Sequence, residues 1–204
     1  MKSPTSRQAG LAGMLGGFLW ALTPLRQPIF GAGRTPDEGE LFFRSYNLVL
    51  LAIFISLTVA LLRLRDFRPP SGRIFTLGWW TILMGHLSVL VGSVPAVLLG
   101  GAARGLVEGG QDLGFLGAMV AAVGAFLVGL SGLRRRAQPM AAWWLLLLTL
   151  PLGLLLVVVL SAAGTPEDYL GLPLTISYGA AWIILGWFWV HQSGTPTPQD
   201  SRAS

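Results

Sequence analysis

One histidine lies in a place where an ionisable side chain would normally be avoided. His86 stands twelve residues into a long apolar run that begins at Ile74, about 18 Å along a helix at 1.5 Å per residue. That is near the middle of a hydrocarbon core of about 30 Å. An ionisable group at this depth is a candidate for a proton relay or a substrate path. The alternative is a neutral imidazole bonded to a hydroxyl or a freed carbonyl on a neighbouring helix.

Two further residues could shape a path beside this histidine. Pro151 lies near the middle of the fifth apolar run and removes the helical hydrogen bond to the Leu147 carbonyl, so a kink is expected there. Kinked helices at the midplane form binding sites in many transporters, although proline is also tolerated in ordinary membrane helices. Tyr178, in the sixth run, could line the same path.

A polar cluster lies on the opposite side of the apolar runs from the most basic loops. Its members are Arg26, Arg34, Asp37, Glu38, Glu40 and Arg44. Two carboxylates and a base could in principle support hydrolysis or bind a cation. Their spacing matches no known ligand set, and the acids before Leu41 also fit a helix cap. We interpret the cluster as a solvated outer loop.

The remaining inventory predicts no catalytic constellation, cofactor or metal. The chain has no cysteine, which excludes thiol nucleophiles, iron–sulfur clusters and cysteine-ligated zinc. It has no phosphate-binding loop and no zinc-protease or serine-hydrolase motif. His86 and His191 lie at different depths, so they cannot form a bis-histidine haem site within one chain.

Composition places the whole chain in a membrane. Of the 204 residues 53% are hydrophobic and 11% charged, well below the roughly 25% charged residues of soluble domains. Proline and arginine weaken the first apolar run, which could be a signal peptide, but no convincing cleavage site follows and we expect a retained helix. We predict an all-α, polytopic transmembrane bundle forming one domain over 1–192, with a disordered cytoplasmic tail over 193–204. The six spans are 11–30, 46–62, 74–101, 113–133, 140–163 and 172–190.

The loops between these runs differ in charge in a way that predicts orientation. One side holds ten basic and two acidic residues, giving +8, and the other four basic and seven acidic, giving −3. Basic loops are retained in the cytoplasm, so both termini should be cytoplasmic, in the cell membrane. The basic side should contact anionic lipid headgroups, and nothing points to nucleic acid. Three tryptophan pairs, Trp79–Trp80, Trp143–Trp144 and Trp187 with Trp189, fall at the same interface.

Small residues predict where the helices touch. Membrane helices associate by close backbone approach at glycine and alanine. Such residues recur on the first run (Gly13, Gly17, Ala21), on the fourth (Gly117, Ala121, Ala125, Gly129) and in one line on the third (Gly78, Gly85, Gly92, Ala96). Because bulky residues occupy the other face of the third run, we expect that helix to be central.

Several segments resemble a loose group of small six-span bacterial integral membrane proteins without assigned function. They are Leu130–Arg136, the Pro151-Leu-Gly153 helix, Ala180–Trp187 and Leu19–Leu25. The resemblance implies a six-span architecture and supplies no catalytic residues.

Three functional hypotheses remain. The first is a non-enzymatic accessory, structural or regulatory component of the cytoplasmic membrane, acting with a membrane-protein partner or as a homo-oligomer. The second is a small permease or proton-linked carrier that uses His86 and the kinked fifth helix. The third is a membrane-embedded enzyme acting on lipid through the outer-face cluster.

Overall fold

The described part of the protein is entirely helical. The computed structural model describes residues 4–25, 40–64, 72–164 and 172–192, and in these ranges it contains no strand. The six α-helices are α1 (Pro4–Leu22), α3 (Glu40–Leu64), α4 (Arg73–Leu99), α5 (Arg104–Arg134), α6 (Met140–Ala162) and α8 (Leu172–Gln192), with short 3₁₀ turns at Thr23–Leu25 and Gly100–Ala103.

Five of these helices are long and apolar enough to cross a membrane, namely α3, α4, α5, α6 and α8. The chain is therefore a multi-span integral membrane protein. α1 is not among these five; its first turn, from Pro4, is polar, and the 3₁₀ turn Thr23–Leu25 follows it directly. Residues 26–30 of the expected first span, and the tail over 193–204, lie outside the described ranges.

Two helices extend well beyond their apolar runs at one end. The second span was expected to begin at residue 46 and the fourth at 113, whereas α3 begins at Glu40 and α5 at Arg104. In each extension an ion pair joins residues four apart, Arg44 to Glu40 at 2.5 Å and Arg104 to Glu108 at 2.9 Å. Pairs at this spacing stabilise exposed helical turns, which explains helix where a loop was expected.

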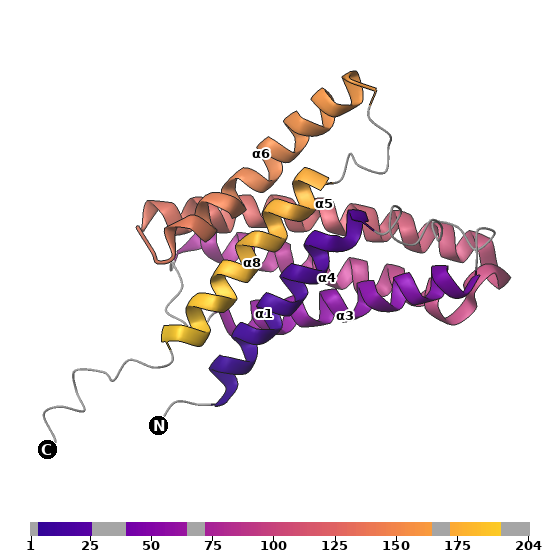
Figure 1. Ribbon diagram of the computed structural model, residues 1–204, viewed down its shortest axis with the longest axis horizontal. Coiled ribbons are helices and arrows are strands. Elements are labelled where there is room, and N and C mark those ends of the chain that lie inside the picture. The colour runs from indigo at the N-terminus through magenta and orange to yellow at the C-terminus, as the bar shows by residue number, and fades with distance from the viewer. Residues whose placement is uncertain (1–3, 26–39, 65–71, 165–171, 193–204) are drawn as a thin grey trace, which may run out of the picture.

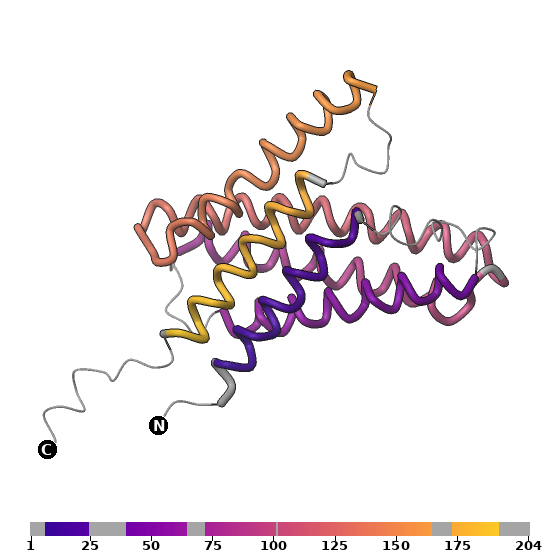
Figure 2. Tube along the Cα trace, in the orientation of Figure 1, coloured from indigo at the N-terminus to yellow at the C-terminus, as the bar shows by residue number. Residues whose placement is uncertain are grey.

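The helices form two close antiparallel pairs that α3 and α6 connect. α4 lies along α5 and α1 along α8, and α3 contacts both α1 and α4 (Figure 1). α6 contacts α5 and α8 near their ends and then diverges from the bundle, as the tube view also shows (Figure 2). Most of the buried core lies among α3, α4, α8 and the facing side of α5, and includes Phe54, Leu57, Ile82, Val128, Trp182 and Leu185.

Glycines spaced by seven residues allow the backbones of α4 and α5 to approach each other closely. A Cβ atom added to Gly78, Gly85 or Gly92 would meet backbone atoms of Gly124, Gly117 and Gly110, respectively. The line predicted on the third run therefore faces a neighbouring helix, as expected. On α5 the residues that face α4 are Gly110, Gly117 and Gly124, which are spaced by seven. Gly129, the last residue of the line predicted on the fourth run, packs instead against Trp143 and Leu147 of α6.

The same spacing recurs in the α1–α8 pair. Gly10 lies against Gly186, and Gly17 lies against Gly179. Both pairs are antiparallel, because the partner number falls as the first number rises. The start of α1 and the end of α8 therefore lie at the same end of the bundle.

Candidate functional site

His86 occupies the centre of the bundle. It lies thirteen residues from each end of α4 and its side chain is 0% exposed. Its Nε2 atom is 2.8 Å from the Tyr178 hydroxyl on α8, and its Nδ1 atom is 3.3 Å from the Thr58 hydroxyl on α3. Both ring nitrogens therefore have a hydrogen-bond partner, each on a different helix.

A neutral imidazole is satisfied here in either tautomer. If Nε2–H donates to the Tyr178 oxygen, the Thr58 hydroxyl donates to Nδ1; if Nδ1–H donates to Thr58, the Tyr178 hydroxyl donates to Nε2. Buried polar groups are stable in an apolar interior only when they are paired in this way. The arrangement is the hydroxyl-bonded imidazole that was the alternative to a functional histidine.

Aromatic rings enclose this cluster. The Phe54 ring meets His86 edge to face with centroids 5.2 Å apart, and the Trp182 ring meets Tyr178 at 6.1 Å. Trp20 of α1 in turn packs edge to face on Phe54 at 5.0 Å. The rings keep water from the imidazole, so His86 does not face the hydrated cavity that a proton-linked carrier would need.

The hydrogen bonds of His86 connect helices whose backbones are mostly far apart. α4 and α8 belong to different glycine-packed pairs, and they scarcely approach through their backbones. The bond from His86 to Tyr178 joins the two pairs at the middle of α4, and Thr58 adds α3. The polar cluster is thus a three-helix hydrogen-bonded link.

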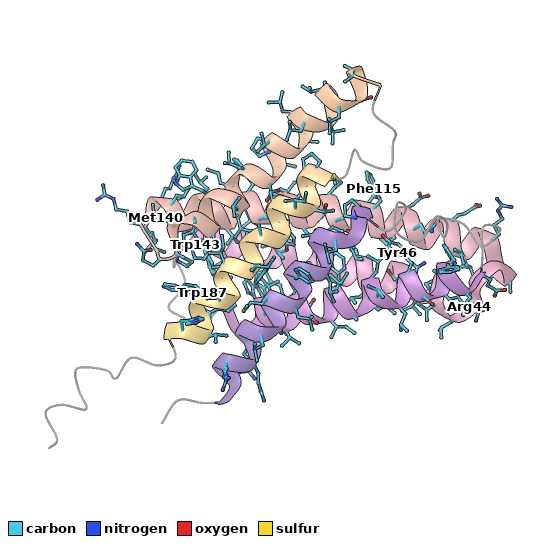
Figure 3. All side chains as sticks on the ribbon, viewed as in Figure 1. Arg44, Tyr46, Phe115, Met140, Trp143 and Trp187 are labelled. Carbon is cyan, nitrogen blue, oxygen red and sulfur yellow. The ribbon has the colours of Figure 1, made fainter. Side chains whose placement is uncertain are left out.

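An apolar cavity lies on the other side of Tyr178. It encloses about 180 Å³ among α1, α3, α5, α6 and α8 and is partly open to the surface. This exceeds the ~150 Å³ of an engineered apolar cavity that stays dry and binds benzene. Its lining is Trp20, Phe54, Phe115, Ala118, Met119, Ala121, Ala122, Thr149, Leu174, Thr175 and Tyr178. Phe115, labelled in Figure 3, is 65% exposed at its rim.

The other predicted site residues do not join this cluster. Pro151 lies within α6 without ending it, and its side chain is exposed on the surface instead of lining the cavity. Arg44 and Glu40 form an ion pair on α3 beside Gly100. Arg26, Arg34, Asp37 and Glu38 lie outside the described residues.

Thr58 and Phe54 complete the site, and sequence reasoning did not single them out. The available signal was weak: Thr58 is a hydroxyl residue in the interior of the second apolar run. Threonine in a membrane helix usually bonds a carbonyl of its own helix, as Thr81 and Thr149 do here, so its type alone identifies no partner.

The described residues contain no group of three or more side chains that could hold a metal ion. Comparison with known proteins finds no matching family model, no similar curated protein and no similar solved structure.

Proposed function

We propose that this multi-span protein is a non-enzymatic accessory component of the cytoplasmic membrane that acts by docking a membrane helix of a partner protein against α6. The observation that carries the proposal is the uneven burial of the spans. The most apolar stretch of α6 is 17% buried, against 39–44% for the other four spans. Leu152, Leu155 and Val158 are among its exposed side chains.

The cavity beside α6 supports the same proposal. Thr149 of α6 and Leu174 of α8 line it together with Phe115, which is largely exposed. Helices associate in lipid through close packing, so an open apolar recess next to an uncovered helix suits a side chain from a partner helix. The closed hydrogen bonding of His86 supports a structural role for the polar centre.

The distribution of charge supports insertion with both termini in the cytoplasm. Arg7, Arg63, Arg73 and Arg134 lie at the end where α1 begins and α5 finishes. Trp143 and Trp187 lie toward that end and Arg44 lies at the other (Figure 3). Tryptophan is enriched at both membrane interfaces, and the excess of arginine at this end is what favours the cytoplasmic side.

Site-specific photo-crosslinking combined with native mass spectrometry tests the docking face. A photoreactive residue replaces Leu155 on α6, and a matched control replaces Leu48 on α3; these leucines are 59% and 58% exposed. After gentle extraction from the native membrane, we expect a defined protein adduct at Leu155 and only lipid adducts at Leu48. Lipid adducts alone at both positions, with a monomer in the mass spectrum, would refute the proposal.

Although His86 itself faces no hydrated cavity, one contact links it to the apolar cavity and keeps the carrier as a second candidate. Tyr178 both lines the apolar cavity and bonds His86, so a ligand in the cavity would lie one side chain from the imidazole. A proton-flux assay in proteoliposomes tests this reading with His86→Ala and, as control, His191→Ala, whose ring is exposed on α8 and bonds the Trp187 carbonyl. Flux that only His86→Ala abolishes would favour the carrier over the accessory protein.

A further inference from the structure

A second recess lies at the basic end of the bundle, far from the apolar cavity. It encloses about 460 Å³ where α4 begins and α5 ends, and its lining is Gly72, Arg73, Ile74, Ser131, Arg134 and Arg135. Three of these six residues are arginines, and none of the described lining residues is acidic. The two ion pairs within α3 and α5 both lie at the opposite end of the bundle.

The backbone adds hydrogen-bond donors to this recess. Gly72 precedes α4 and supplies no side-chain cap, so the first N–H groups of that helix have no capping side chain. Arg73 and Ile74, which belong to this first turn, both line the recess. A helix N-terminus favours an anion through its N–H groups and its dipole.

The end of α5 holds its arginines in a compact turn. The backbone N–H groups of Arg135, Arg136 and Ala137 donate to carbonyls of Ser131, Leu133 and Gly132. These carbonyls are therefore satisfied by backbone N–H groups.

Gly72 also brings the two helix ends together. Its φ of 133° is one that side-chain-bearing residues rarely adopt, and an added Cβ would lie 3.2 Å from an Nη2 atom of Arg135. A glycine at this position lets the guanidinium of Arg135, which directly follows α5, approach the start of α4.

We propose that this recess binds a phosphate group, carried by an anionic phospholipid of the adjoining leaflet or by a soluble phosphate ester. Guanidinium groups bind phosphate oxygens through paired, charge-assisted hydrogen bonds. Ile74 and the start of the α4 span place the recess at the membrane boundary, where basic pockets between helices meet lipid headgroups. The proposal is independent of the partner that docks on α6.

Lipid binding by the purified full chain tests the proposal. Native mass spectrometry compares phosphatidylglycerol with phosphatidylcholine of the same acyl chains, on the wild type and on Arg73→Gln/Arg134→Gln. The control, Arg7→Gln/Arg63→Gln, removes the same charge at the same end but outside the recess. We expect the preference for phosphatidylglycerol to fall about tenfold in the recess variant and less than about twofold in the control.

Two additions distinguish the remaining outcomes. Arg73→Lys/Arg134→Lys should retain binding, and thermal melting of each variant in phosphatidylcholine micelles checks that it folds. If inorganic phosphate binds the wild type and the recess variant loses it, while the two lipids bind alike, the site stands with a soluble ligand. Equal losses in the recess and control variants, or neither lipid preference nor phosphate binding in the wild type, would overturn the proposal.

Discussion

The packing of α4 on α5 leads to a sharp prediction for Gly85→Ala. A Cβ atom at Gly85 would lie 2.5 Å from the Gly117 carbonyl oxygen and 2.6 Å from the Ala121 nitrogen. The first distance is about 0.9 Å short of ordinary contact, and both obstacles are backbone atoms that no side-chain rotation can move. The two helices must therefore move apart along their interface.

The cost can be estimated from two opposing terms. Overpacking a close interface costs about 1–3 kcal/mol, and we take about 2–3 kcal/mol because the obstacles are backbone. Replacing glycine by alanine inside a helix returns up to about 1 kcal/mol. We therefore expect Gly85→Ala to lower the free energy of unfolding by about 1–2 kcal/mol.

A control on the facing helix separates these terms. Gly114 lies on α5 near Gly92, but its own added Cβ would meet nothing within 4 Å. Gly114→Ala should therefore show only the stabilisation from the higher helix propensity of alanine. The free energies of unfolding of the two variants should differ by about 2–3 kcal/mol.

Unfolding in mixed micelles with increasing dodecyl sulfate provides the assay, followed by tryptophan fluorescence. Trp79 is a suitable reporter on α4, because its side chain is buried and its Nε1–H donates to the Leu61 carbonyl of α3 at 2.9 Å. If Gly85→Ala and Gly114→Ala unfold within about 0.5 kcal/mol of each other, the glycine-mediated contact of α4 and α5 is refuted.

Two further predictions concern the polar centre and the orientation. Tyr178→Phe leaves Nε2 of His86 without its partner and should lower the free energy of unfolding by about 1–2 kcal/mol in the same assay. As a control, Ser56→Ala removes a hydrogen bond within one helix and should change the free energy of unfolding by less than about 0.5 kcal/mol. Equal effects of the two variants would contradict the three-helix link. In this cysteine-free chain, an impermeant maleimide should label Glu108→Cys in intact cells and Gln138→Cys only after permeabilisation, and the reverse pattern would overturn cytoplasmic termini.

The sequence was sufficient for the class of fold. Long apolar runs separated by short charged loops predicted a helical membrane bundle, and five of the six expected spans have the length and hydropathy to cross. The depth of His86 and the inward-facing glycine line of α4 were also predictable, because position along a helix and angular spacing are local properties.

The sequence pattern predicted the starts of α3 and α5 at the wrong residues. The charged turns before Tyr46 and before Leu113 have the composition of loops, yet both are helical and carry ion pairs four residues apart. Hydropathy detects where a chain is buried in lipid, and it does not detect where a solvated helix continues beyond the membrane.

The environment of His86 was decided by tertiary structure alone. Its partners Thr58 and Tyr178 are 28 and 92 residues away in the chain, on helices that meet only in the folded bundle. The sequence determined that an ionisable ring lies at mid-depth in an apolar helix. Packing decided that both its nitrogens are bonded, that α6 stands apart, and that Arg73 and Arg134 line one recess, because such arrangements depend on which helix faces meet and no single helix encodes them.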